Sequence, residues 1–300
     1  MTRVVKVSVS VATLALLLWW ADAEAVAERL RGADPMWLGV AWLSLTVSTF
    51  LMARRWQILT HALLMELPFK RALAEYYISQ LVNAVLPGGV VGDVGRAIRI
   101  RHDGDLIRAA QSVAAERLIG QIAMFLFMAV GFACALLLPG GIAWPPITWL
   151  GLAALGVAAL TATVFARRDT STARFLRLVL GLMRNLHLIL NAAVIVVLLI
   201  FSLYACARAT GTIIPIGATF TLIPLVLSAM LIPLSVGGWG WREGAAAALF
   251  PLIGATPSAG IAMGIAYGTA ITLAALPALV FLAVPSQANP LSKTVKLESP

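Results

Sequence analysis

LPGGVVGDVGR, residues Leu86–Arg96, follows an apolar run and combines a proline, several glycines, an aspartate and an arginine. IPLSVGGWGWRE, residues Ile232–Glu243, does the same further along the chain. In both stretches a glycine follows the proline by five residues and an arginine follows it by nine. Helix breakers and charges at membrane depth are tolerated only where protein or a polar cavity satisfies the freed backbone groups and the charge. The two breaks therefore predict a transport or lipid-handling site.

The rest of the chain has the composition of a membrane protein. Of its 300 residues 61% are hydrophobic and 12% are charged, and the mean hydropathy is +0.94, which excludes a soluble globular protein. We predict an all-α polytopic integral membrane protein that forms a single membrane domain over residues 1–300. About six stretches reach the ~20 residues that a crossing helix needs: 4–21, 36–53, 109–138, 147–166, 187–207 and 258–284. The two broken segments, 72–101 and 213–250, are predicted to be re-entrant helical hairpins.

The net charge of +9 would suit a nucleic-acid partner, but the positions of the basic residues explain it. We place the N-terminus in the cytoplasm and let each broken segment return to the side that it entered. Only Arg29, Arg31 and Arg208 then lie outside, Arg117 and Arg242 lie at membrane depth, and the rest of the 22 Lys and Arg lie inside. This bias follows the positive-inside rule. We expect no nucleic-acid partner, a bacterial-type inner (cytoplasmic) membrane, and both termini in the cytoplasm.

A basic linker at 167–186 divides the chain into two comparable halves, 36–166 and 187–285, followed by an expected disordered cytoplasmic tail at 286–300. Each half contains one broken segment. Under this topology the first enters from the cytoplasm and the second from outside, which predicts an inverted repeat. Secondary transporters with inverted repeats place their site near the middle of the membrane, between the repeats.

The broken segments also predict the chemistry of that site. The second arm of a re-entrant hairpin begins at the tip, so its first free N–H groups face the membrane interior, where the positive helix end attracts anions. Arg96 and Arg242 follow closely, and the planar arginine fork suits phosphate. We expect Asp93 to cap the first arm or balance Arg96, and Glu243 to do the same for Arg242. We therefore predict a site for a phosphate-bearing lipid headgroup. The predicted tips are formed by Pro87, Gly88, Gly89 and Gly92 in the first hairpin and by Pro233, Ser235, Gly237, Gly238 and Gly240 in the second.

A further charged pair, Glu116 and Arg117, opens the predicted span at 109–138. Neighbours in a helix point about 100° apart, so each needs a partner elsewhere. The candidate partners are Arg96 or Arg242 for Glu116, and Glu243 or Asp93 for Arg117. The pair either contacts substrate or belongs to an ion-pair network that joins the halves.

Two polar residues of the first broken segment, Asn83 and Gln80, are further candidates for the substrate site. They either line a cavity or form hydrogen bonds between helices.

Four motifs now stand in a fixed order: Arg54-Arg55-Trp56; Asn83 to Pro87 running into Gly92-Asp93 and Arg96; Ser112-Val113 with Glu116-Arg117 and Gly120; and Pro233-Leu234-Ser235 running into Gly237 to Gly240 and Arg242-Glu243. Together they resemble the lysylphosphatidylglycerol synthase transmembrane (flippase-like) family over about 40–285. One departure is Val91, where the family usually has a second glycine. Members that make aminoacylated lipid carry a cytosolic transferase domain after the membrane part, and none follows here, so the resemblance implies the transport part alone.

The resemblance implies that the protein moves a phosphate-bearing or glycosylated envelope lipid between leaflets. We expect the headgroup to enter the polar space between the hairpins while the tails stay in lipid, and rocking of the halves to expose the site alternately. The expected partners are membrane lipids with an anionic headgroup or a lipid-linked glycan, and an envelope-lipid synthase or glycosyltransferase. Two alternatives stay open: a small-anion secondary transporter, and a non-transporting scaffold for an envelope-lipid synthase.

Catalytic chemistry finds little support in the sequence. An intramembrane enzyme needs a nucleophile with a base, or paired acids that bind a metal, and the Gly92-Asp93 region lacks further aspartates. The glycine-rich stretch at 88–95 lacks the strand-turn-helix unit of a dinucleotide site. We expect no catalytic residue, no metal and no cofactor.

Overall fold

The computed structural model describes residues 3–86, 89–101, 106–137, 144, 146–231 and 235–283. These residues are almost entirely helical and include no strand, which confirms the all-α membrane fold. The helices are α1 Arg3–Trp20, α2 Ala23–Arg31, α3 Pro35–Ala62, α4 Phe69–Val85, α5 Val91–Ile100, α6 Leu106–Leu137, α7 Pro146–Phe165, α8 Ser171–Leu182, α9 Leu186–Ala209, α10 Ile216–Ala229, α11 Trp241–Leu249, the 3₁₀ turn η1 Phe250–Ile253, α12 Pro257–Ala275 and α13 Ala278–Ala283.

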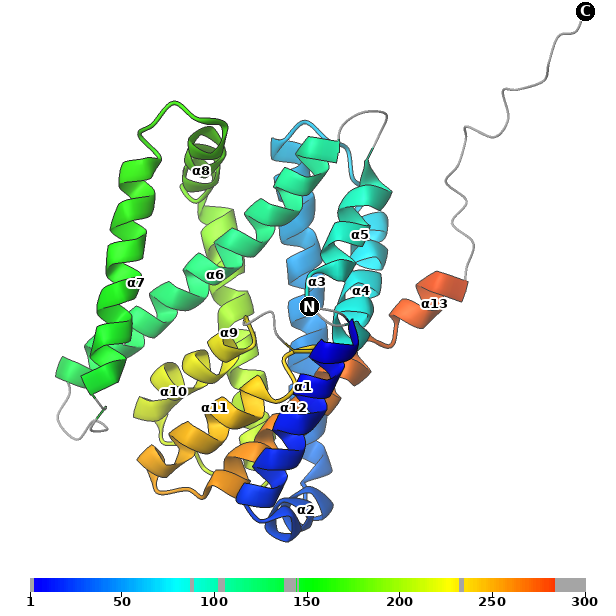
Figure 1. Ribbon diagram of the computed structural model, residues 1–300. Coiled ribbons are helices and arrows are strands. Elements are labelled where there is room, and N and C mark those ends of the chain that lie inside the picture. The colour runs from blue at the N-terminus through cyan, green and yellow to red at the C-terminus, as the bar shows by residue number, and fades with distance from the viewer. Residues whose placement is uncertain are drawn as a thin grey trace, which may run out of the picture.

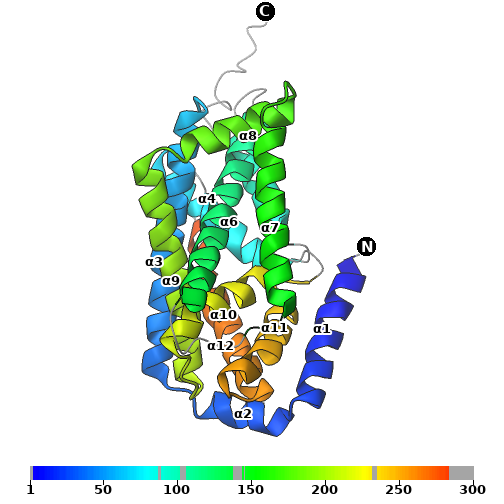
Figure 2. The same cartoon turned by 90° about the vertical axis from the view of Figure 1, so that its left-hand side faces the viewer.

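Within the described ranges, four helical stretches are long and apolar enough to cross a membrane: Pro35–Ala62, Leu106–Ala135, Leu186–Ala209 and Pro257–Ala283. A fifth results if α1 and α2, which meet at a bend of 96°, are counted as one broken span. About six full spans therefore stay a prediction, as does the division into two repeated halves. Helices α3 and α9 pack side by side along the long direction of the molecule (Figure 2).

Both predicted broken segments fold as helical hairpins. In the first, α4 ends at Val85 and α5 begins at Val91, and the two helices pack against each other. In the second, α10 ends at Ala229 and α11 begins at Trp241, and these two helices also pack together. The second arms α5 and α11 have 10 and 9 residues, which at 1.5 Å per residue reach about 15 Å. That is about half of the ~30 Å hydrocarbon thickness, so neither arm could cross it.

The two hairpins approach from opposite ends of the molecule, and their tips meet near its middle. Figure 1 shows α4 and α5 in the upper half and α10 and α11 in the lower half. The contact joins Gly237 to Ala84: a Cβ on Gly237 would lie 3.1 Å from the Ala84 carbonyl oxygen. Gly237, Gly238 and Gly240 have φ of +55°, +83° and +89°, a region that glycine enters without steric cost.

One predicted span is longer than expected, and two stretches outside the predicted spans are helical. Helix α3 continues to Ala62 instead of ending at 53, because Arg55 is paired with Glu116 inside the protein. The stretch at 22–34 contains α2, capped by Asp22. The linker at 167–186 contains α8, capped by Thr170. The predicted disordered tail at 286–300 lies outside the described residues.

Candidate functional site

The predicted hairpin tips are described in part. Pro87, Gly88 and Pro233 lie outside the described residues. Gly89 adopts φ of +62°, and Ser235 is buried. Gly92 lies in the first turn of α5, so close to α4 that a Cβ would sit 2.8 Å from the Ser79 carbonyl carbon. The tight approach of α5 to α4 therefore requires a glycine at this position.

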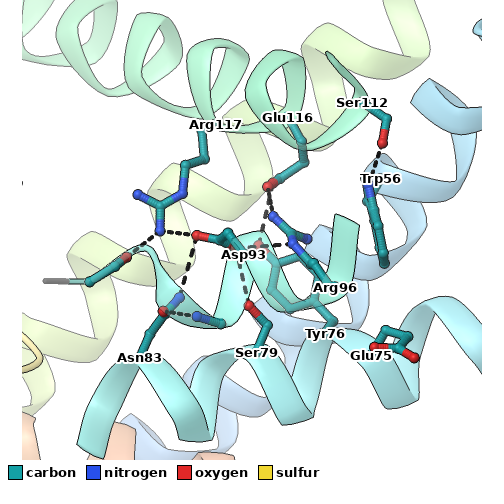
Figure 3. Close-up of polar contacts among 12 residues, drawn as sticks. Trp56, Glu75, Tyr76, Ser79, Asn83, Asp93, Arg96, Ser112, Glu116 and Arg117 are labelled. Atoms are coloured by element: carbon teal, nitrogen blue, oxygen red, sulfur yellow. Dashed lines mark hydrogen bonds and ion pairs between the residues drawn. The ribbon is translucent and has the colours of Figure 1, made fainter. Parts of the chain in front are cut away.

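Near the tip of the first hairpin, five charged side chains form an alternating chain. Figure 3 labels four of them, Asp93, Arg96, Glu116 and Arg117. Arg96 on α5 lies between two carboxylates, with Nη2 3.0 Å from Glu116 Oε2 and Nε 3.0 Å from Asp93 Oδ1. The second contact lacks the alignment of a hydrogen bond. Glu116 Oε1 also accepts from Arg55 Nη2, and Asp93 Oδ2 pairs with Arg117 Nη2. The order is Arg55, Glu116, Arg96, Asp93, Arg117, so both carboxylates lie between two arginines. We call this set the arginine–carboxylate chain.

Two aromatic rings enclose Arg96. Its guanidinium carbon lies 4.6 Å from the ring centres of both Trp56 and Tyr76, at the distance of cation–π contacts. Trp56 Nε1 donates to Ser112 Oγ at 3.0 Å, and Tyr76 OH lies 3.4 Å from Glu116 Oε1. Arg96 is only 1% exposed, so its orientation is fixed by the helices around it.

Polar residues of α4 position Asp93. Ser79 Oγ donates to Asp93 Oδ1 at 3.1 Å, and Asn83 Nδ2 donates to Oδ2 at 3.4 Å. The Asn83 amide oxygen accepts the Gly92 N–H at 2.8 Å, which satisfies one of the free donors at the start of α5. Asn83 therefore joins the two arms of the hairpin. Figure 3 shows Asn83 and Ser79 on one face of α4, below Asp93.

Gln80 bonds to a neighbouring helix. Its Nε2 lies 3.1 Å from Thr49 Oγ1 on α3, and the Thr49 hydroxyl lies 3.2 Å from Gln80 Oε1. Arg117, 36% exposed in its side chain, donates to the carbonyl oxygen of Gly89. The tip of the first hairpin is thus bonded to α6.

The second hairpin holds a closed ion pair. Arg242 Nε lies 2.9 Å from Glu243 Oε1, Nη2 bonds to the same oxygen, and both residues are 0% exposed. Glu243 Oε2 accepts the Gly240 N–H at 2.6 Å and so occupies the start of α11. The rings of Trp239 and Tyr267 lie 4.9 Å and 5.7 Å from the Arg242 guanidinium carbon. The start of α11, which we predicted to bind an anion, is therefore occupied by the Glu243 carboxylate, which both caps this arm and balances Arg242 as expected.

A cavity of about 430 Å³ lies between these two groups, within the range of small-molecule sites. Both hairpin tips contribute to its wall, together with α3, α6, α9 and α12. Every predicted substrate residue except Glu243 lines it; Glu243 is reached through Arg242. Several buried polar atoms of the lining have no hydrogen-bond partner in the described part of the chain: Arg55 Nε and Nη1, Arg96 Nη1, Ser228 Oγ and Ser235 Oγ. These donors make the cavity suited to an anionic, hydrogen-bond-accepting group.

Arg55 is the main site residue that the sequence reasoning did not identify. We placed Arg54 and Arg55 on the cytoplasmic side, just after a span predicted to end at 53. In the structure only Arg54 is exposed, whereas Arg55 is 3% exposed and lines the cavity. The apolar residues Ile58 and Leu59 that follow were the available signal that the helix continues.

The ion pairs also decide between the candidate partners. Glu116 contacts Arg96 and not Arg242, and Arg117 contacts Asp93 and not Glu243. The arginine–carboxylate chain therefore connects α3, α5 and α6 within the first half and does not join the halves. Among the residues that the structure describes, no group of three or more His, Cys, Asp or Glu is placed to bind a metal ion.

Comparison with known proteins places these features in a family. The family described as lysylphosphatidylglycerol synthase TM region matches residues 4–280. A membrane protein of Pyrococcus horikoshii, UPF0104 membrane protein PH1989, is 24% identical over 177 residues, which cover 56% of this chain and 51% of that protein. The match thus spans about half the length of this curated relative. No solved structure matches the chain.

Proposed function

This chain belongs to the lysylphosphatidylglycerol synthase transmembrane family, and on that premise we propose that it moves a lipid with a phosphate-bearing or glycosylated headgroup between the leaflets of a membrane. The observation that carries the proposal is the cavity of about 430 Å³ between the two hairpins. Its free arginine and serine donors can bind a polar headgroup inside an otherwise apolar molecule.

The proposed cycle uses the contact between the tips. The contact of Gly237 with Ala84 is the point at which the two hairpins meet. A headgroup enters from one leaflet, replaces water at the free donors of Arg55 and Arg96, and leaves its acyl chains in the lipid. Rocking of one hairpin against the other then exposes the same donors to the opposite leaflet. The chain's own residues bind and orient the headgroup, and we assign them no catalytic step.

We place the protein in a bacterial-type inner membrane with both termini in the cytoplasm. An envelope-lipid synthase or glycosyltransferase would supply the lipid.

The test is transport in liposomes. We expect the reconstituted protein to move phosphatidylglycerol with a fluorescent acyl chain from the inner to the outer leaflet, measured by bleaching of the outer leaflet. Arg96→Ala and Arg242→Ala each remove a buried arginine and should slow transport roughly tenfold or more, since hydrogen bonds to charged groups contribute about 1.5–3 kcal/mol. Arg54→Ala, in an exposed arginine of α3, is the matched control. Wild-type rates in both buried-site variants would show that the site is elsewhere.

A second candidate function is secondary transport of a small soluble anion. The observation in its favour is that the free donors of Arg55 and Arg96 recognise phosphate whether or not it carries acyl chains. Uptake of labelled inorganic phosphate into the same liposomes, with no movement of labelled lipid, would favour this alternative. A non-transporting role as a membrane scaffold is favoured if neither labelled phosphate nor labelled lipid moves and an envelope-lipid synthase co-purifies with the protein.

A further inference from the structure

The charged residues at the cavity do not balance. Arg55, Arg96, Arg117 and Arg242 line it, together with Asp93 and Glu116, and Glu243 contacts it through Arg242. Four arginines thus face three carboxylates. Since Arg242 and Glu243 neutralise each other, the surplus positive charge belongs to the arginine–carboxylate chain.

The order of residues in the arginine–carboxylate chain shows where the surplus positive charge lies. Each carboxylate is shared by two arginines, so Arg55 and Arg117 are the ends. Arg117 pairs with Asp93, donates to the Gly89 carbonyl oxygen and is 36% exposed in its side chain. Arg55 is 3% exposed, bonds to Glu116 through Nη2, and leaves Nε and Nη1 without a partner in the described residues. Arg55 is therefore the end with unused donors.

A buried, uncompensated charge in a membrane protein is costly, and it is neutralised by a partner or a ligand. We propose that the cavity selects a headgroup with one net negative charge, such as a phosphodiester, and that Arg55 contacts it. This deepens the proposed function and rests on it only for the source of the headgroup. A headgroup with one negative charge makes the occupied cavity electrically neutral. A zwitterionic headgroup leaves the positive charge uncompensated. A doubly negative headgroup makes the cavity negative, and a cationic headgroup makes it more positive.

The shape around Arg55 agrees with this role. Gly120 on α6 faces the guanidinium, and a Cβ there would lie 3.1 Å from Nη2. The missing side chain leaves room for the arginine fork between α3 and α6. Arg96, by contrast, is enclosed by Trp56 and Tyr76 and shared by two carboxylates. Arg96 keeps only Nη1 without any partner in the described residues, whereas Arg55 keeps both Nε and Nη1 for a phosphate.

The experiment measures equilibrium lipid binding rather than transport. Protein in nanodiscs of phosphatidylcholine is titrated with phosphatidylglycerol, phosphatidic acid or lysylphosphatidylglycerol, and bound lipid is counted by native mass spectrometry. We expect wild type to bind phosphatidylglycerol best, by about tenfold or more over phosphatidylcholine, the effect of one charge-assisted hydrogen bond. Arg55→Gln should abolish this preference, while Arg54→Gln, in the exposed neighbour, should keep it.

Two further variants separate charge from position. Glu116→Gln raises the surplus by one, so the preference should shift toward phosphatidic acid. Arg55→Lys keeps the charge but loses the fork, so the preference for phosphatidylglycerol should persist with weaker binding. This conservative variant also keeps the test available if Arg55→Gln does not fold. The inference is overturned if wild type shows no headgroup preference, or if Arg55→Gln keeps the wild-type preference. It is also overturned if Glu116→Gln does not shift the preference toward phosphatidic acid.

The outcomes for the two proposals differ. Arg55-dependent binding of phosphatidylglycerol without movement in liposomes supports the inference and rejects lipid transport. Movement of lipid in liposomes without any headgroup preference in binding supports lipid transport and rejects the inference. Deacylated phosphatidylglycerol, a soluble phosphodiester, distinguishes the source: if it displaces the lipid at equal concentration, the cavity recognises a free anion of the same charge.

Discussion

Replacing Gly92 by alanine should break the packing of the first hairpin. A Cβ at this position would lie 2.8 Å from the Ser79 carbonyl carbon and 2.9 Å from Asn83 Oδ1, both well inside the 3.4 Å at which ordinary contact begins. The nearest atoms belong to the backbone of α4, so a side-chain rotation does not relieve the clash, and α5 must move away.

The cost can be worked from these contacts. Overpacking typically costs about 1–3 kcal/mol. Moving α5 also lengthens the Gly92 N–H bond to Asn83 and the Ser79 bond to Asp93, at about 1 kcal/mol each. Alanine returns about 1 kcal/mol through helix propensity. The net loss is roughly 2–4 kcal/mol, or about 4–16 °C in melting temperature on the scale of soluble chains of 150–250 residues.

Gly95→Ala is the matched control, because it makes the same change in the same helix. The three atoms nearest to its Cβ would all belong to the Arg99 side chain, the closest at 2.9 Å, and this flexible end can move. We expect melting of the detergent-solubilised protein, followed by circular dichroism, to drop for Gly92→Ala and to stay or rise for Gly95→Ala. Equal melting temperatures in the two variants would refute the close approach of α5 to α4.

Three more predictions concern other parts of the chain. Arg242→Gln strands the Glu243 carboxylate and should cost about 3–5 kcal/mol in the same melting assay; the double variant with Glu243→Gln should recover at least half, and a loss equal to the sum of both single variants would contradict the buried pair. Trp56→Phe keeps a ring beside Arg96 but loses the hydrogen bond to α6, which should lower stability by about 1 kcal/mol and leave lipid movement intact; loss of transport at normal stability would show that the indole acts directly. Lys70→Cys and Glu24→Cys, each in a protein without the native cysteines, should react with a membrane-impermeant maleimide from opposite sides of the membrane, and labelling from one side would overturn the proposed topology.

The position of the hairpins could be predicted from the sequence because proline, glycine and arginine are rare together in apolar runs. Arg55 could not be assigned in the same way. A charge near the end of an apolar run normally marks the membrane surface, and successive helix residues point about 100° apart. Whether Arg54 or Arg55 faces inward depends on Glu116, which lies 61 residues further along the chain.

For Arg242 and Glu243 the sequence predicted capping or charge balance, and the structure shows both at once. Adjacent residues on a helix do not normally face each other, and that rule was the basis for seeking distant partners for Glu116 and Arg117. At the start of α11 the rule fails, because Glu243 turns back to cap Gly240 and its carboxylate then lies within reach of the long Arg242 side chain. A capping interaction can therefore pair two neighbours that a regular helix would separate.

The contact between Ala84 and Gly237 also has an electrical consequence. Where polar recesses reach toward each other from the two faces of a membrane, the voltage drops mainly across the thin layer that separates them. In the proposed transport cycle, the main-chain contact between Gly237 and Ala84 would form that layer. A unit charge that crosses the full potential changes energy by about 2.3 kcal/mol per 100 mV, so an ion that passed this contact would experience much of the driving force. An anionic lipid held by the positive surplus would then experience it on release, and the release step would be the one that responds to membrane voltage.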